Sequence, residues 1–195
     1  LTRIPCEVDI GSEFRYRDPI IEEGTYVIVI SQSGETADTI AAIREAHRKG
    51  ARVAAIVNVV GSTISREADD VFYTWAGPEI AVATTKGYTT QVLAFYMIAL
   101  QMGLVRGTIG EQDYIYYLDA LEQIPDQGQT MIDRADVVAR YAAMYKDAKD
   151  VFYIGRGLDH ALSMEGSLKL KEVSYVHSEA YAAGERKHGT IALIE

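Results

Sequence analysis

A run of small polar residues follows a strongly apolar segment near the start of the chain. The apolar segment is Tyr26–Ile30, and the polar run, Ser31-Gln-Ser-Gly-Glu-Thr36, leads into a helical pattern. The first N–H groups of a helix have no partners within it and carry the positive end of its dipole. Hydroxyl groups and a glycine would let an oxyanion approach those N–H groups. The run therefore predicts an anion site whose side-chain donors are Ser31, Gln32, Ser33 and Thr36.

The same run also fits a simpler interpretation. Ser33 or Thr36 could cap the following helix, while Gly34 eases the turn. The run is not a P-loop, because the Gly-Lys-Ser/Thr ending is absent, and Gly155-Arg-Gly157 lacks the third glycine of a dinucleotide fingerprint. Capping and anion binding both stay open, and no nicotinamide cofactor is expected.

A second group of reactive side chains lies near the end of the chain. Glu165, Lys169 and Glu172 are spaced i, i+4 and i+7, which places them on one face of a helix. This stripe is either a solvated set of salt bridges or a general base, Glu172, with Lys169 as the cation that orients it. Among the histidines, His188 is the acid/base candidate, because it precedes a glycine in a loop of small residues. The other histidines, His47, His160 and His177, are assigned no role, and no spacing suits a metal.

Short apolar segments alternate with helical patterns along the chain. Strands are expected at 26–30, 53–57, 70–75 and 151–154, and helices at 37–49, 84–102, 114–123, 132–146 and 158–175. Pro125 and Gly128 are expected to separate the third and fourth helices. Continuously apolar strands are typical of a parallel sheet covered on both faces. The pattern predicts an α/β fold, a three-layer αβα sandwich of the doubly wound, flavodoxin-like kind.

Composition narrows the possible partners. The 195 residues carry a net charge of −9, which argues against nucleic acid as a partner. The single cysteine, Cys6, allows no internal disulfide and fits a reducing compartment such as the cytoplasm. The longest apolar run, Val92–Leu100, is too short to cross a bilayer, so no membrane association is expected. Both ends look cut, which indicates a fragment truncated at either side.

Three segments resemble one known family. They are Ser31–Thr36, Val82-Ala-Thr-Thr-Lys-Gly-Tyr-Thr-Thr-Gln91, and the stretch from Lys169 through His188-Gly. They resemble the isomerase region of the glutamine–fructose-6-phosphate aminotransferase family, and the similarity runs from Ser12 to Ile194. The serine-rich run alone would indicate only the wider sugar-isomerase (SIS) fold, whereas the block from Lys169 to His188 is more specific.

The resemblance implies two SIS subdomains that share one sugar-phosphate site. Residues 1–105 would form the C-terminal part of the first, 106–148 a helical linker, and 149–195 the N-terminal part of the second. The phosphate of fructose 6-phosphate would lie in the Ser31–Thr36 run, with Val82 and Thr84 along the sugar. The groups implied to act at the reacting end are Lys169, which lies near it, Glu172, which moves a proton between C1 and C2, and His188, which assists ring opening.

The same resemblance implies partners outside this chain. In the family the histidine comes from a neighbouring subunit, so a homodimer is expected, and a glutaminase domain of the same parent chain supplies ammonia to make glucosamine 6-phosphate. Cys6 is not that domain's nucleophile, and the family's Schiff-base lysine and its opening glycine-and-serine strand are absent. Thr84 and Thr190 depart from the usual serine and proline. A stand-alone SIS isomerase or deglycase and a non-catalytic sugar-phosphate sensor remain as alternatives.

Overall fold

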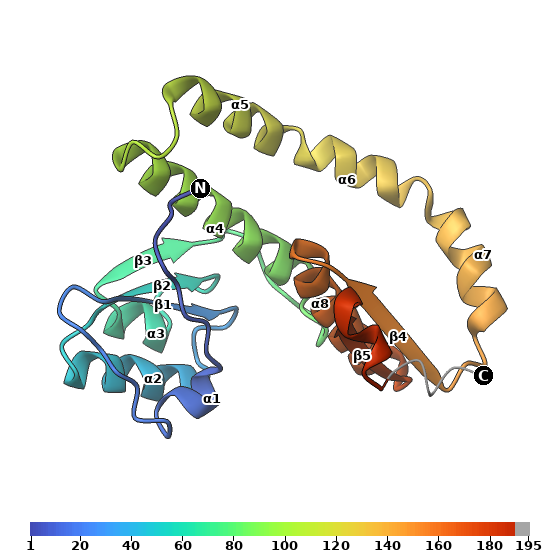
Figure 1. Cartoon of the computed structure of the whole chain (residues 1–195), viewed down its shortest axis with the longest axis horizontal. Coiled ribbons are helices and arrows are strands. Elements are labelled where there is room, and N and C mark those ends of the chain that lie inside the picture. Colours follow the sequence, from blue (N-terminus) through green and yellow to red (C-terminus); the bar gives the residue numbers. More distant parts are fainter. Residues whose placement is uncertain (190–195) are drawn as a thin grey trace. The chain divides into compact units, whose positions relative to one another are not determined.

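The computed structural model describes residues 1–189, apart from the side chain of Arg186. Thr190 therefore lies outside the described residues. The chain forms two compact units, one from Leu1 to Ile124 and one that begins at Pro125 (Figure 1). The subdomain bounds expected from the resemblance, 1–105, 106–148 and 149–195, stay a prediction.

The first unit is built on a three-stranded parallel sheet. Its strands are β1 (Tyr26–Ser31), β2 (Arg52–Val57) and β3 (Asp70–Tyr73), in the spatial order β1-β2-β3. The register pairs Ser31 with Val57 and Val57 with Tyr73. All three strands therefore end at one edge, where the loops that follow them meet.

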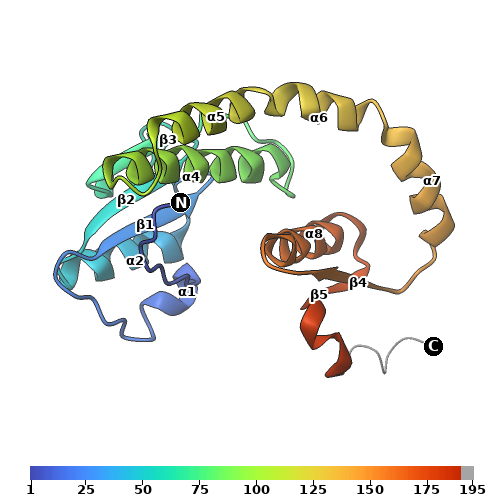
Figure 2. The same ribbon diagram turned by 45° about the horizontal axis from the view of Figure 1, so that its top comes forward.

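Helices cover both faces of this sheet. On one face lie α1 (Gly11–Phe14), α2 (Ala37–Arg48) and α3 (Thr63–Glu67), and on the other lies α4 (Thr85–Val105), which packs on α5 (Glu111–Glu122) (Figures 1 and 2). Ile43 of α2, Val53 of β2 and Ile64 of α3 are fully buried in one cluster. The predicted three-layer α/β architecture is confirmed in this unit.

Helix α4 is longer than the sequence pattern suggested. It extends to Val105 rather than to residue 102, and by length and composition it is apolar enough to cross a membrane. The expectation that the chain holds no such segment is wrong, because α4 reaches this hydropathy as an average over apolar and polar residues, not as one unbroken apolar run. Core helices of globular proteins pass the same test, and α4 packs against β2 and α5.

The helices after α5 correct one prediction. Pro125 and Gly128 were expected to lie between two helices, but both lie within α6 (Ile124–Ile132). Helix α7 (Ala135–Tyr145) follows. Pro125 is the second residue of α6, where its missing N–H would have had no helical partner in any case.

The second unit contains a two-stranded parallel sheet. Strand β4 (Asp150–Gly155) leads into α8 (Leu158–Ser174), and β5 (His177–Ala182) returns beside β4, followed by a short 3-10 helix, η1 (Ala183–Lys187). The sequence pattern did not predict β5. Helix α8 packs on both strands, and the buried hydroxyls of Ser167 and Ser178 lie 3.0 Å apart between them.

Candidate functional site

The polar run after β1 forms a tight turn at the carboxyl edge of the sheet. Ser31 Oγ accepts a hydrogen bond from the Gly34 N–H at 3.0 Å and lies 2.8 Å from Thr36 Oγ1. Ser33 Oγ accepts from the Glu35 N–H at 3.2 Å. Ser31 is only 6% exposed, whereas Ser33 and Thr36 are open to solvent. We call residues 31–36 the serine loop.

The hydroxyl groups of the serine loop do not cap α2. Thr36 occupies the N-cap position with an extended backbone, but its side chain makes no cap hydrogen bond. The Ser33 hydroxyl bonds within the loop instead. The capping alternative is therefore wrong for Thr36 and Ser33, and a hydroxyl-rich turn stands at the N-terminus of a 12-residue helix.

Gly34 is required by the shape of this loop. Its φ is +68°, a left-handed value that side chains rarely adopt, and a Cβ there would collide with Ser62 Oγ. Its carbonyl oxygen accepts from the Ile64 N–H at 2.9 Å. The serine loop is therefore packed against the first turn of α3, with no space between them for a side chain.

Thr84 lies beside the serine loop. A Cβ added to Gly87 in the first turn of α4 would lie 2.8 Å from Thr84 Cγ2 and 3.2 Å from Gln32 Cγ, so both side chains flank that glycine. Thr84 has a left-handed φ of +53°, a conformation that costs about 1–3 kcal/mol outside glycine. Its hydroxyl donates to the Val82 carbonyl oxygen at 3.1 Å, while the Val82 side chain is exposed.

Asn58, which the sequence pattern does not single out, also contacts the serine loop. Its backbone N–H donates to the Gln32 carbonyl oxygen at 3.2 Å. Its side chain accepts from the Ala76 N–H at 2.8 Å and donates to the Gly77 carbonyl oxygen at 2.7 Å. Asn58 thereby joins the serine loop to the segment that leads toward Thr84. A polar residue directly after a buried strand, at the edge where ligands bind in such sheets, was the available signal.

In the second unit the predicted stripe on α8 forms an ion cluster. Lys169 Nζ lies 3.2 Å from Glu165 Oε1 and 3.0 Å from Glu172 Oε2. Burial lowers the pKa of Lys169, but the hydrogen bonds to Glu172 and Glu165 outweigh it and leave the pKa above its usual value. Lys169 is thus a cation shared between two carboxylates rather than a base.

His188 follows η1 with its ring largely in solvent. Its backbone N–H donates to the Glu185 carbonyl oxygen at 2.8 Å, and its side chain is 74% exposed. The ring Nε2 lies 4.0 Å from Glu185 Oε2, at the limit of an ion pair. By contrast, His47 and His177 lie within 3.0 Å of Asp69 and Asp150.

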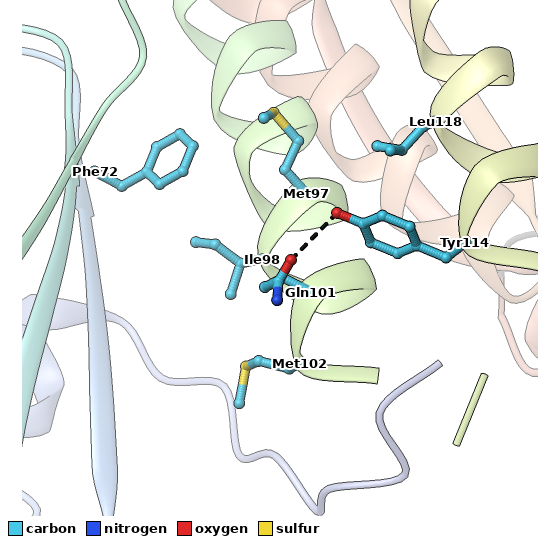
Figure 3. Close-up of a pocket in the computed structure, with 7 residues that line it drawn as sticks. All are labelled: Phe72, Met97, Ile98, Gln101, Met102, Tyr114 and Leu118. Atoms are coloured by element: carbon cyan, nitrogen blue, oxygen red, sulfur yellow. Dashed lines mark hydrogen bonds between the residues drawn. The ribbon is translucent and has the colours of Figure 1, made fainter. Parts of the chain in front are cut away.

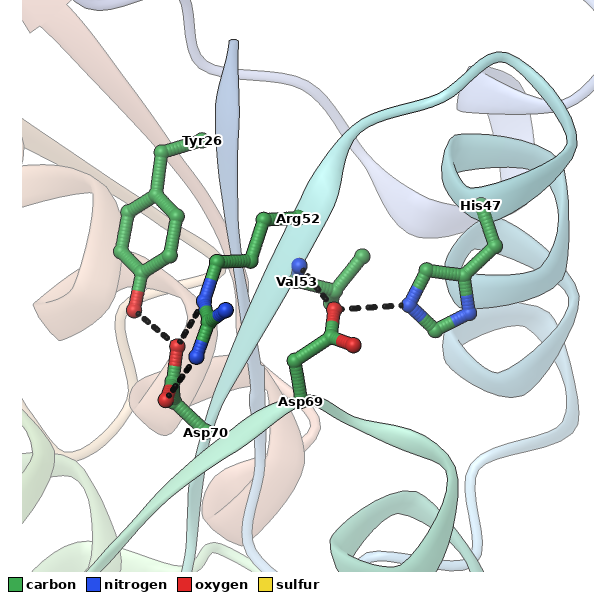
Figure 4. A network of polar contacts seen from close by, with 6 residues as sticks. All are labelled: Tyr26, His47, Arg52, Val53, Asp69 and Asp70. Carbon is green, nitrogen blue, oxygen red and sulfur yellow. Dashed lines mark hydrogen bonds and ion pairs between the residues drawn. The ribbon is translucent and has the colours of Figure 1, made fainter. Parts of the chain in front are cut away.

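The amino edge of the first sheet is built differently (Figure 4). Arg52 holds Asp70 through two hydrogen bonds of 2.8 Å, and the Tyr26 hydroxyl donates to the same carboxylate at 3.0 Å. The Arg52 hydrogen bonds, followed by the one from Tyr26, lower the pKa of Asp70 to about 2. Asp69 beside it accepts from the Val53 N–H at 2.7 Å. These carboxylates are fully partnered, which suits stability rather than ligand binding.

An apolar hollow of about 310 Å³ lies between β3, α4 and α5 (Figure 3). The hollow is lined by Phe72, Met97, Ile98, Gln101, Met102, Tyr114 and Leu118, and Tyr114 donates to Gln101 Oε1 at 3.2 Å. It contains none of the predicted site residues and no charged group that would bind an anion. In the part of the chain that the structure describes, no cluster of histidine, cysteine and carboxylate side chains could hold a metal.

Comparison with known proteins gives a consistent result. The chain is 62% identical over 193 residues to the glutamine–fructose-6-phosphate aminotransferase [isomerizing] of Caldanaerobacter subterraneus subsp. tengcongensis and 58% identical over 195 residues to that of Clostridium tetani. These matches cover 99% and 100% of this chain but 32% of each relative, so the chain spans about a third of their length.

A solved structure agrees with the sequence relatives. The C-terminal domain of glucosamine-fructose-6-phosphate aminotransferase from Francisella tularensis superposes with a TM-score of 0.97 at 37% identity, covering 100% of this chain and 55% of that one. The SIS domain family matches residues 1–101 and 144–195, and the gap between them spans α5, α6 and most of α7. The match takes in the serine loop, the α8 ion cluster and His188. The chain therefore belongs to the SIS domain family.

Proposed function

We propose that this chain is the isomerising portion of a glutamine–fructose-6-phosphate aminotransferase. The parent protein would convert fructose 6-phosphate and glutamine-derived ammonia into glucosamine 6-phosphate. The observation that carries the proposal is the serine loop, which gathers three hydroxyl groups around a buried glycine at an uncapped helix start. The relatives support it through their shared name and their similarity along the whole chain.

The phosphate of the sugar would bind in the serine loop. The hydroxyls of Ser31, Ser33 and Thr36 and the side-chain amide of Gln32 would donate to its oxygens, together with the first N–H groups of α2. The loop contains no lysine or arginine. Binding would therefore rely on oriented dipoles, which suits a ligand that must also be released.

The sugar would extend from the phosphate toward Val82 and Thr84. Thr84 carries a methyl group where the family usually has serine, and the close fit of that methyl against Gly87 supports a role in shaping the sugar pocket. The strained backbone of Thr84 supports the same role, because such strain concentrates at functional sites.

Glu172 would be the base of the isomerisation. It would take a proton from C1 of the open-chain sugar and return it to C2, so one carboxylate serves two adjacent carbons and is regenerated. Lys169 would orient Glu172 through the contact of 3.0 Å. His188 would assist ring opening from the neighbouring subunit of a homodimer, and its exposed ring supports that arrangement.

The remaining steps would depend on the rest of the parent protein. A glutaminase domain in the same chain would release ammonia, and the relatives' name supports that partnership. The composition supports a cytoplasmic location, since there is one exposed cysteine and no disulfide.

Changing Glu172 to Gln in the full-length protein tests the chemistry. Loss of a general base is expected to lower kcat by about 10²–10⁴-fold, while the affinity for fructose 6-phosphate changes little. Glu165→Gln is the matched control, because it removes the other carboxylate on Lys169, and an ion pair of this kind contributes only about 0.2–0.5 kcal/mol. Unchanged synthesis of glucosamine 6-phosphate by the Glu172 variant would refute the proposed base. Sugar-phosphate binding without turnover in the unmodified protein would instead indicate a sensor.

A further inference from the structure

The serine loop contains one residue that its proposed ligand should disfavour. Glu35 carries a negative charge between Gly34 and Thr36, next to the place proposed for a phosphate dianion. Like charges at short range repel, and a carboxylate competes with phosphate for the same N–H donors. The geometry of the Glu35 side chain explains how the loop tolerates it.

The Glu35 carboxylate is turned away onto α3. Its Oε1 accepts from the Thr63 N–H at 2.8 Å, at the first residue of that helix. The backbone hydrogen bond from Thr63, and next the Thr63 hydroxyl, hold the pKa of Glu35 below its usual value. The carboxylate therefore accepts a hydrogen bond at the start of a neighbouring helix, where the N–H groups lack helical partners.

A second hydrogen bond fastens the same peptide. The Ile64 N–H donates to the Gly34 carbonyl oxygen at 2.9 Å. Consecutive N–H groups of α3 thus hold consecutive residues of the serine loop. The Gly34–Glu35 segment is therefore held at two points, the Gly34 carbonyl oxygen and the Glu35 carboxylate.

Ser62, the residue before α3, packs against Gly34 of the serine loop. It is 3% exposed, its Oγ bonds to no described part of the chain, and it lies directly against Gly34. The loop has no room to slide toward α3. The hydrogen bonds of Glu35 and Gly34 to α3 keep it from moving away from that helix.

We propose that Glu35 is a positioning residue for phosphate binding, which latches the serine loop to α3 through the Thr63 N–H. The latch keeps the loop's hydroxyls and the first N–H groups of α2 pointed at the ligand, and it keeps the Glu35 charge off the ligand. This inference rests on the proposed function of the serine loop. Glu35 is exposed, so its replacement leaves the core intact.

Three variants of the full-length protein separate positioning from simple charge repulsion. Glu35→Ala removes the acceptor, Glu35→Gln keeps an acceptor but no charge, and Glu67→Gln neutralises the ion pair with Arg44 at the other end of α3 as a control. We expect Glu35→Ala to weaken the binding of inorganic phosphate and of fructose 6-phosphate about tenfold by calorimetry. Glu35→Gln should stay within about twofold of the unmodified protein, and Glu67→Gln should bind unchanged.

Steady-state kinetics provide the readout that a merely structural role would not give. Glu35→Ala should raise KM for fructose 6-phosphate and leave kcat nearly unchanged, whereas partial unfolding would lower kcat at constant KM. Equal or tighter binding by Glu35→Ala would overturn the latch, because repulsion alone predicts that result. If the unmodified protein bound neither phosphate nor fructose 6-phosphate, both the latch and the proposed function would fail. Binding that is intact in all variants would overturn the latch alone.

Discussion

The two edges of the sheet β1-β2-β3 use polar residues in opposite ways. At the amino edge, Asp70 is held by Arg52 and Tyr26, and its charge is matched by a guanidinium. At the carboxyl edge, hydroxyls and one glycine form a turn without a cation. The paired carboxylate and guanidinium stabilise the fold, and their hydrogen-bonding groups are already occupied. The hydroxyl and N–H groups of the turn can still bind an anion.

Backbone strain lies beside the serine loop. Thr84, which is not a glycine, has a left-handed φ of +53°, and the surroundings of Gly34 have no room for a Cβ. Strain of this kind costs free energy and persists where the surroundings impose it. The contrast predicts that changes at the carboxyl edge alter ligand affinity, while changes at the amino edge alter stability alone.

Replacing Gly34 by Ala should have the largest effect. The new methyl group collides with Ser62 and needs a left-handed backbone, so the loop must move. We expect the affinity for fructose 6-phosphate to fall about 10–100-fold, which corresponds to about 1–3 kcal/mol.

Gly24→Ala is the matched control for that change. Gly24 has a φ of +82° but no atom within 4 Å of an added Cβ. The Gly24→Ala variant should lose some stability through backbone strain, as measured by thermal unfolding. Its affinity for fructose 6-phosphate, measured by calorimetry, should stay unchanged. Equal affinity losses in the two variants would remove the special status of the carboxyl edge.

Ser31→Ala should have an intermediate effect. The change removes a proposed phosphate donor and leaves the buried Gly34 N–H without its acceptor. A loss of about 1 kcal/mol, or about fivefold in affinity, is expected by calorimetry. Ser65→Ala, which loses only a bond to the Ser62 carbonyl oxygen, should bind normally. Unchanged affinity in the Ser31 variant would exclude this hydroxyl from the site.

Asp70→Asn at the amino edge should leave ligand affinity unchanged. The folded pKa of Asp70, about 2, lies below its ordinary value of 3.8, so the group stabilises the fold above pH 4 and this contribution is lost as pH falls toward 2. Acid unfolding monitored by circular dichroism should therefore show a shallower loss of stability between pH 4 and 2 in the variant. Tyr26→Phe, which keeps the Arg52 pair, should show a smaller change. An altered affinity for fructose 6-phosphate in Asp70→Asn would contradict the division between the two edges.

The sequence alone predicted the elements whose residues are consecutive in the chain. The apolar run of β1, the polar turn after it and the helix that follows are consecutive, so hydrophobic periodicity and helix-start signals sufficed. Strand β5 was not predicted, because its sequence, His177-Ser-Glu-Ala-Tyr-Ala, lacks a β-branched run and its structure depends on pairing with β4. Helix α6 was not predicted, because Pro125 was taken as a helix breaker, whereas a proline in the first turn does not stop a helix.

The partners of the serine loop could not be predicted in the same way. Thr63 lies 28 residues from Glu35, and Asn58 reaches Gln32 only because β1 and β2 are adjacent. Such contacts depend on the register of the sheet, which short-range patterns do not specify. The donor side chains were therefore predictable, and the residues that hold them in place were not.

The most direct test compares fructose 6-phosphate with fructose by calorimetry on the full-length protein. If the serine loop binds the phosphate, two or more charge-assisted hydrogen bonds should favour the phosphorylated sugar at least about 100-fold, and Gly34→Ala should remove most of that preference. Equal affinity for the two sugars, or a preference that survives Gly34→Ala, would contradict the account.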